Sequence, residues 1–302
     1  MAVLIGIVYH DILPVFLVAG TGYLFGRFMR PDIRATNWLA LYILSPCLVF
    51  NMITSSKVGG QEFGQIAAFT VVGVLASGGM AWLAARGLGL NGAQTRAMML
   101  PVMFVNSGNF GLAVTQFAFG EEALARAAVY FAVNSLLVYT LGLYLAAGHG
   151  VSPLMALKRV LGAPPVYAVA LAGLLRVTGL SLPEPVQQSV ALIGQASIPV
   201  FLLILGVQLS RVTVVQEWRP VITASLVRLV AGALVGVFLA PVFGLDGPAR
   251  QAAVLEASMP PAVFNIILAS EYDLEPCLVS SMVVLSTLLA PLTLTLVIAA
   301  LR

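Results

Sequence analysis

The stretch 105-VNSGNFGLAV-114 places two asparagines, one serine and two glycines within six positions of a long apolar segment. Lipid offers no hydrogen-bond partners to loose backbone groups. Non-helical backbone at membrane depth is tolerated only where it is buried in protein or lines a water-filled cavity. The stretch therefore predicts a membrane-spanning helix that is interrupted for a functional reason.

The rest of the chain is typical of a polytopic membrane protein. Its 302 residues are 60% hydrophobic and 9% charged, and the mean hydropathy is +1.01, whereas a soluble domain carries about 25% charged residues. Long unbroken apolar runs favour helices over the alternating segments of a barrel. No Walker motif, GxSxG, metal-ligand spacing or basic patch with interleaved aromatics occurs. We therefore expect no cofactor, no metal, no enzyme activity and no nucleic-acid partner.

We predict ten membrane spans, each near the ~20 residues that cross a bilayer. They are residues 8–27, 36–54, 63–86, 94–118, 122–147, 162–179, 186–209, 219–243, 249–271 and 276–300. Nine Lys and Arg residues fall on the side reached after the first span, and five fall on the other side. This bias predicts a multi-pass protein of the plasma (cell inner) membrane with both termini on the non-cytoplasmic side.

Two halves of the chain look alike. The stretch 14-PVFLVAGTGYL-24 shares six of eleven positions with 165-PVYAVALAGLL-175, and 106-NSGNFG-111 aligns with 260-PPAVFN-265. We predict a first repeat over 1–150 and a second over 151–302. Because five spans is an odd number, the second half enters the membrane from the opposite side, which gives the inverted repeat of secondary transporters.

The two interrupted spans occupy matching positions in these halves, and such a pair points to a transporter's binding site. Glycines are expected to loosen the first, and two prolines obstruct the second. Each break creates a helix N-terminus that suits an anionic ligand. The candidate substrate-binding residues are Asn106, Ser107, Gly108, Asn109, Gly111, Pro260, Pro261 and Asn265. Asn109 and Asn265 are the leading ligand groups, although these amides could instead satisfy local backbone or a neighbouring helix.

Other polar residues inside the spans have more than one interpretation. Glu256 could take part in proton or sodium coupling, or could pair with a cation. Arg228 could pair with Glu256, balance a substrate charge, or extend to the interface. We interpret Asp11 as an interfacial charge. Possible cavity-lining residues are Pro46, Asn51, Asn134 and Gln208.

The run 20-GTGYLFG-26 contains glycines but lies within a span and follows no strand pattern. Gly22 and Gly26 therefore predict a close contact between helices and not a nucleotide-binding loop.

The stretches 106-NSGNFGL-112, 198-IPVFLLILGVQL-209, 259-MPPAVFNIILASEYDLEP-276 and 283-VVLSTLLAPLTL-294 resemble the auxin efflux carrier family. That family includes plant PIN-type auxin carriers and many bacterial members, and the resemblance covers essentially the whole chain. It implies ten helices as two inverted five-helix repeats, with the fourth and ninth helices broken and crossing. It also implies a scaffold from spans 8–54 and 162–209, and a mobile transport domain from spans 63–147 and 219–300.

The resemblance further implies an elevator mechanism and organic-anion substrates, typically carboxylates. The crossover-site residues of the family map onto Asn106 to Gly111 and onto Pro260 to Asn265. This chain departs from the family at Ala113, where a proline is usual, and it lacks the long cytoplasmic loop of plant members. Auxin is therefore not implied as the substrate, and the short form resembles the bacterial members.

The sequence thus predicts a secondary transporter of small organic anions, with the substrate at the crossing of two broken helices. One alternative is a sodium-coupled bile-acid-type symporter, which is expected to place acidic and polar cation ligands around the crossing. Only Glu256 is a candidate for that role. A non-transporting membrane sensor is an alternative from another class. The coupling ion and a homodimer stay open.

Overall fold

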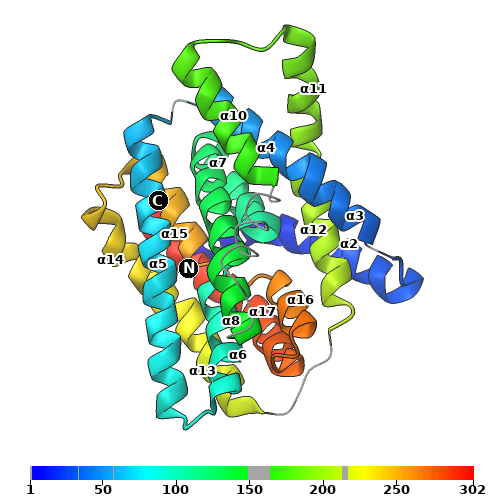
Figure 1. The fold of residues 1–302 in the computed structure, drawn as a ribbon, viewed down its shortest axis with the longest axis vertical. Coiled ribbons are helices and arrows are strands. Elements are labelled where there is room, and N and C mark those ends of the chain that lie inside the picture. Colours follow the sequence, from blue (N-terminus) through cyan, green and yellow to red (C-terminus); the bar gives the residue numbers. More distant parts are fainter. Residues whose placement is uncertain (1, 33, 57, 149–163, 213–216) are drawn as a thin grey trace.

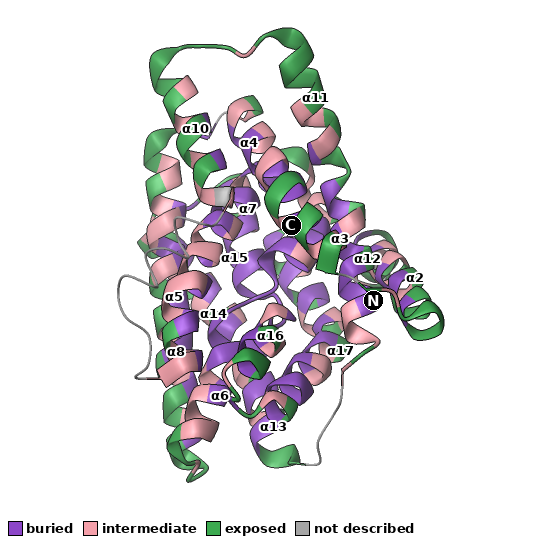
Figure 2. Ribbon diagram, turned by 45° about the vertical axis from the view of Figure 1, so that its right-hand side comes forward, coloured by how far each residue is buried: buried purple, intermediate pink, exposed green. Residues whose placement is uncertain are grey.

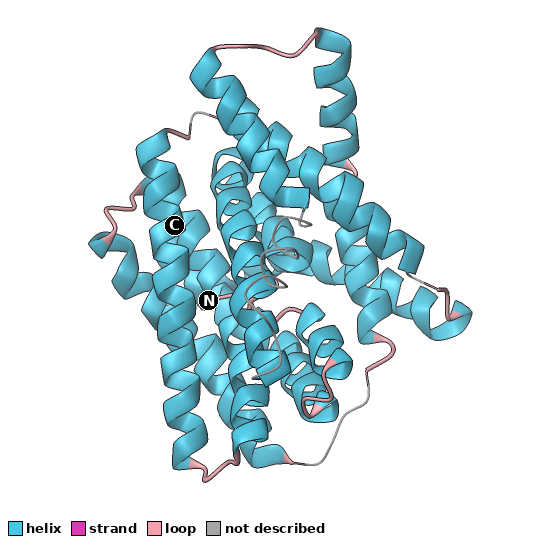
Figure 3. Ribbon diagram, viewed as in Figure 1, coloured by secondary structure: helices cyan, strands magenta, loops and turns pink. Residues whose placement is uncertain are grey.

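The computed structural model describes residues 2–32, 34–56, 58–148, 164–212 and 217–302 (Figure 1). The regular elements in these ranges are helices, and no strand occurs among them (Figure 3). One isolated antiparallel bridge pairs Val105 with Pro261. The predicted all-helical fold is confirmed for the part of the chain that the structure describes.

Seven helical segments of the described residues are long and apolar enough to cross a membrane. They are Val3–Met29, Arg34–Ser55, Gly60–Gly87, Ser107–Ala147, Glu184–Leu209, Trp218–Val242 and Pro276–Leu301. These segments make a multi-pass membrane protein. Shorter helices lie between them, namely α6 (Gly92–Met103), α10 (Pro164–Thr178), α15 (Gly247–Ala257) and α16 (Phe264–Glu271). Ten spans therefore stay a prediction, because length and apolarity alone identify seven.

Most of the long segments are built from several elements in series. The α-helical elements are α1 (Ala2–Ile7), α2 (Leu13–Met29), α3 (Arg34–Leu39), α4 (Ser45–Ser55), α5 (Gly60–Gly87), α7 (Leu112–Leu137), α8 (Leu143–Ala147), α11 (Glu184–Gln195), α12 (Ser197–Leu209), α13 (Trp218–Leu226), α14 (Gly232–Val242) and α17 (Pro276–Leu301). Widened π-helical turns join some of them, namely η1 (Val8–Ile12), η2 (Ala40–Leu44), η3 (Ser107–Gly111), η4 (Val138–Gly142) and η6 (Val227–Ala231). Inside α7, Gly120 has φ 77° and ψ −167°, a conformation open to glycine, so the chain turns there.

The helices α2 and α12 pack closely along their small residues. A Cβ on Gly22 would overlap the backbone of Leu203, and a Cβ on Gly206 would overlap the backbone of Ala19. A Cβ on Gly26 would meet the α12 backbone at 2.9 Å. The close helix contact predicted for Gly22 and Gly26 is confirmed.

The helices gather in two regions of the molecule. In Figure 1, α2, α4, α10, α11 and α12 occupy the upper and right-hand part of the view, and α5, α13, α14 and α15 occupy the left. Buried residues concentrate around α7 and α15, whereas the outer ends of α10 and α11 are exposed (Figure 2). The candidate site is lined by residues of α3, α4, α7, α12 and α16.

Some predictions fall on positions outside the described residues. They include the boundary between the two predicted halves at 150 and 151, and three basic residues that contributed to the sidedness count, Lys57, Lys158 and Arg159.

Candidate functional site

The first interruption separates α6 from η3. After α6 ends, the backbone of Phe104 is extended, with φ −107° and ψ 104°. Pro101 lies inside α6, where a proline removes one helical hydrogen bond. The helix resumes at Ser107. The expectation that Gly108 and Gly111 cause the break is wrong, because both lie in the first turns of the resumed helix.

These two glycines serve close packing. A Cβ on Gly108 would approach the ring of Phe131 to 2.6 Å, and a Cβ on Gly111 would approach the carboxyl carbon of Glu256 to 2.8 Å. Each position therefore holds glycine because a neighbouring side chain occupies the space that a Cβ needs.

The second interruption separates α15 from α16. Pro260 and Pro261 lie between Ala257, where α15 ends, and Phe264, where α16 begins. Neither proline has a backbone N–H group, and a proline ring obstructs the preceding helical turn. This is the break that the sequence predicts, at the predicted place.

Hydrogen bonds join the two interruptions as an antiparallel pair. The N–H of Asn106 donates to the carbonyl oxygen of Pro260 at 2.8 Å, and the N–H of Ala262 donates to that of Phe104 at 3.0 Å. Asn265 Nδ2 donates to the same Phe104 carbonyl oxygen at 2.9 Å, across a sequence separation of 161 residues. The two interruptions therefore form one hydrogen-bonded unit, which we call the crossing (residues 104–107 and 260–265).

A cavity of about 350 Å³ lies beside the crossing. The first interruption and the turn after it contribute Asn106, Ser107, Gly108 and Asn109 to its lining, and the second contributes Ala262, Val263 and Phe264. The first turns of both resumed helices therefore border the same cavity.

Five of these lining residues carry backbone N–H groups that have no hydrogen-bond acceptor among the described residues. They are Ser107, Gly108, Asn109, Val263 and Phe264. The first N–H groups of a helix have no partner within the helix, and together they carry a partial positive charge. The cavity is thus bordered by a set of unused donors from two helices.

Polar side chains from α4, α7 and α12 reach this cavity as well. Asn134 Nδ2 donates to Ser107 Oγ at 3.0 Å and to the Val105 carbonyl oxygen at 3.3 Å. Asn134 Oδ1, Gln208 Oε1 and Ser45 Oγ are buried without a hydrogen-bond partner in the described part of the chain. No charged side chain occurs among the described residues that line the cavity.

Several predicted site residues do not line the cavity. They are Gly111, Pro260, Pro261, Asn265, Pro46 and Asn51. Asn265 is 0% exposed and uses its amide to bind Phe104, so the structure makes it a link between the two breaks and not a group that faces the cavity. Asn51 borders a separate cavity near α11, and Ser45 takes the lining position expected for Pro46.

Arg228 and Glu256 do not form an ion pair. Arg228 is 2% exposed, and its Nη1 and Nη2 donate to the carbonyl oxygens of Val102 and Ala257. Glu256 is 0% exposed, and its Oε1 accepts a hydrogen bond from Thr115 Oγ1 at 3.2 Å. The predicted pairing of the two, and the extension of Arg228 to an interface, are therefore wrong.

Asp11 forms an ion pair with a distant arginine. It is 3% exposed in η1, and its Oδ2 lies 2.6 Å from Arg302 Nη2 in an ion pair. Its partner lies at the far end of the sequence, just after α17, and the interfacial position expected for this carboxylate stays a prediction.

Sequence reasoning missed the aromatic wall of the cavity. Trp38, Phe131, Tyr139, Phe201 and Phe264 line it, and the rings of Tyr139 and Phe264 lie 5.8 Å apart. Phe131, Phe201 and Phe264 lie in helices whose polar and apolar residues are not separated into faces, so no periodicity distinguishes the face towards the cavity from the face towards lipid. The cavity therefore combines unused polar donors with a large apolar surface.

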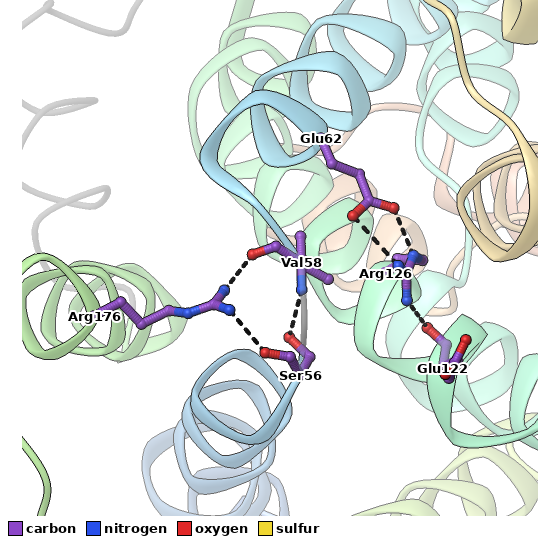
Figure 4. A network of polar contacts seen from close by, with 6 residues as sticks. All are labelled: Ser56, Val58, Glu62, Glu122, Arg126 and Arg176. Carbon is purple, nitrogen blue, oxygen red and sulfur yellow. Dashed lines mark hydrogen bonds and ion pairs between the residues drawn. The ribbon is translucent and has the colours of Figure 1, made fainter. Parts of the chain in front are cut away.

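A second polar network lies where α4 is joined to α5 (Figure 4). The Arg176 guanidinium donates to the carbonyl oxygens of Ser56, at 2.7 Å, and Val58. Arg126 pairs with Glu62 at 2.6 Å. The Arg176 side chain therefore joins α10 to Ser56 and Val58, the Arg126–Glu62 pair joins α7 to α5, and none of these residues lines the cavity.

The sequence is similar to known membrane transporters. The model of a family described as membrane transport protein matches residues 7–152 and 151–298. A protein named "Uncharacterized transporter" from Methanothermobacter thermautotrophicus is 28% identical over 286 residues, which cover 93% of this chain and 94% of the relative. A second uncharacterized transporter, from Methanocaldococcus jannaschii, is 25% identical over 286 residues, which cover 91% of this chain and 93% of that relative.

Auxin efflux carrier component 3 of Arabidopsis thaliana is 27% identical over 118 residues, which cover 38% of this chain and 18% of that protein. The resemblance noted in the sequence is therefore confirmed. The chain belongs to the membrane transport protein family, the family of the auxin efflux carriers.

Proposed function

We propose that this membrane transporter carries small carboxylates, bound at the crossing with the carboxylate group against the two resumed helices. The observation that supports this most directly is the set of unused N–H groups at Ser107 to Asn109 and at Val263 and Phe264. Backbone donors at a helix N-terminus bind anions readily, because the hydrogen bonds and the helix dipole act in the same direction.

The charge of the cavity favours a monocarboxylate. Each helix N-terminus carries roughly half a positive charge, so two of them balance about one negative charge. A dicarboxylate brings a second charge that no described lining side chain neutralises. The aromatic wall suits an apolar body on the same ligand, and about 350 Å³ lies at the small end of ligand cavities.

The proposed architecture is ten spans in two inverted repeats. It divides Ser107–Ala147 at Gly120 and joins the part before Gly120 to α6 as one span, and it counts α10 and α15–α16 as two further spans. Two successive family matches, over 7–152 and 151–298, support the division into halves. The close packing of α2 on α12 and of α4 on α10 and α11 supports a scaffold that stays together while the remaining helices move as an elevator.

The same proposal places the chain in the plasma (cell inner) membrane with both termini on the non-cytoplasmic side. It rests on the distribution of Lys and Arg between the loops.

We propose Glu256 as the coupling group, for a proton or for sodium. Its carboxyl group is buried, receives one hydrogen bond from Thr115, and has a second oxygen without a partner among the described residues. A charged carboxylate is costly to bury without a partner, so uptake of a cation here is physically favoured. The contact with Gly111 links this group to the first turns of the helix that borders the cavity.

The test uses the purified full chain and two families of ligands. A ligand that binds the native state raises its apparent unfolding temperature by mass action. We expect phenylacetate and related monocarboxylates to stabilise the protein and succinate to do so much less. Proteoliposomes loaded with the stabilising ligand should then show saturable counterflow of its labelled form.

Two results would count against this proposal. If no monocarboxylate stabilises the protein while dicarboxylates do, the charge argument fails. If a carboxylate binds but shows no counterflow in either direction, the sensor alternative is favoured over transport.

A further inference from the structure

Each interruption leaves two kinds of backbone group without a helical partner. The N–H groups lie where a helix resumes, and the carbonyl groups lie where the preceding helix ends. The last carbonyl groups of α6 and α15 have no hydrogen-bond donor within the helix, because each helix ends before the N–H group of the next turn. These C-terminal ends carry roughly half a negative charge each. They lie in protein, away from the cavity, since Val102 and Ala257 are not among its lining residues.

One side chain binds both of these ends. Arg228 Nη1 donates to the Val102 carbonyl oxygen at 2.6 Å, and Nη2 donates to the Ala257 carbonyl oxygen. Val102 lies in the last turn of α6, and Ala257 is the last residue of α15. A planar guanidinium offers donors in a fixed fork, so it can hold two acceptors at a set separation.

The local structure is adapted to this arrangement. Arg228 lies in the widened turn η6, and a Cβ on Gly232 would overlap the guanidinium, so position 232 leaves room for it. The side chain is 2% exposed and forms no ion pair with an acid among the described residues. Its charge of +1 faces two ends that together carry about −1, which compensates the charge without a carboxylate.

We propose that Arg228 is the positioning residue of the crossing: it ties the C-terminal ends of both half-helices together and thereby fixes the two N-terminal ends at the cavity. Arg228 does not line the cavity, so in this proposal it does not contact the substrate. The proposal rests on the proposed function only where substrate binding is the measurement.

Two amides report directly on this role. The N–H groups of Asn106 and Ala262 make the hydrogen bonds that cross between the interruptions. Hydrogen–deuterium exchange of peptides covering 104–111 and 258–265 follows both in the full chain, without any carboxylate present. In Arg228→Met we expect at least tenfold faster exchange in both peptides, because one side chain holds both segments.

Arg219→Met is the matched control. It makes the same substitution on α13, which continues into η6, but Arg219 is exposed and should leave both peptides at wild-type exchange. Wild-type exchange in Arg228→Met, or faster exchange in one peptide only, would overturn the proposal. If Arg228→Met does not fold, Arg228→Lys keeps the charge without the planar fork. We then expect faster exchange in both peptides, and wild-type rates there would overturn the proposal as well.

Ligand binding gives a second readout. We expect the phenylacetate concentration that half-saturates the thermal shift to rise at least tenfold in Arg228→Met and to stay unchanged in Arg219→Met. Equal values in Arg228→Met and wild type would overturn the positioning role. If phenylacetate does not stabilise the wild type, the proposed function is contradicted, and the exchange measurement still decides the role of Arg228.

Discussion

Replacing Asn109 with aspartate adds one negative charge to the cavity with almost no change of shape. Asn109 is half-buried, lines the cavity, and is the third residue of the helix that resumes at Ser107. The new carboxylate acts on two quantities, the stability of the unliganded protein and the affinity for an anion. The structure predicts opposite signs for these two effects.

The magnitudes follow from the position of the side chain. An acid in the first turn of a helix is stabilising by about 0.3–1 kcal/mol, because it meets the positive end of the dipole. A bound carboxylate at about 5 Å from the new charge is repelled by roughly 3 kcal/mol at an effective dielectric constant near 20. Repulsion of that size weakens binding roughly 100-fold.

The assay measures both effects on the same sample. Thermal unfolding without ligand should give Asn109→Asp a melting temperature equal to or slightly above the wild-type value. Titration with phenylacetate should give a dissociation constant about 100-fold higher, since the repulsion far exceeds the gain from the dipole. Asn91→Asp is the matched control, because Asn91 caps the N-terminus of α6 and does not line the cavity.

One pattern of results would refute the reasoning. If Asn109→Asp binds phenylacetate as tightly as Asn91→Asp and the wild type do, the carboxylate group does not lie against the helix that begins at Ser107. A loss of affinity together with a loss of unliganded stability would point to misfolding and not to charge repulsion.

Further predictions follow from close contacts and from the buried acid. Gly206→Ala should lower the free energy of unfolding by about 1–3 kcal/mol, because its Cβ meets the α2 backbone; Gly20→Ala, which meets nothing within 4 Å, should not destabilise. Gly111→Ala should also lower the melting temperature, and combining it with Glu256→Ala should recover part of the loss, because the overlap is with that carboxyl group. Glu256→Gln should fold and bind phenylacetate but flatten the dependence of counterflow on pH or sodium. Unaltered dependence on both would exclude Glu256 as the coupling group.

The interruptions could be predicted because their causes are local. Two consecutive prolines at 260 and 261 remove two backbone donors and obstruct the preceding helical turn, whatever surrounds them in the fold. The first break was placed well but explained wrongly, because Gly108 and Gly111 permit helix as well as loop. Glycine is needed at these two positions because the side chains of Phe131 and Glu256 occupy the space that a Cβ would take. Those contacts exist only in the folded protein.

The partners of the polar groups could not be predicted, because they come from distant parts of the chain. The sequence suggests that Asn265 and Asn109 are equivalent. In the structure Asn265 donates to the Phe104 carbonyl oxygen, 161 residues away in the sequence, whereas Asn109 lines the cavity. A helix whose polar and apolar residues are not separated into faces gives no period from which the inward face can be read. Ser45 and the aromatic wall were missed for that reason. Arg228 shows the limit most clearly, since its acceptors are backbone carbonyls, which every residue has.

The contacts within the crossing constrain how the proposed transport movement can occur. Two backbone hydrogen bonds, the Asn265 amide and the Arg228 guanidinium all join the first interruption to the second. Sliding one interruption past the other would break these bonds in a place where water is scarce, at a cost of about 1–3 kcal/mol for each group left unpaired. The proposed elevator avoids this cost if the crossing moves as one body. Relative movement then falls on the other wall of the cavity, where Ser45, Phe201 and Gln208 come from α4 and α12.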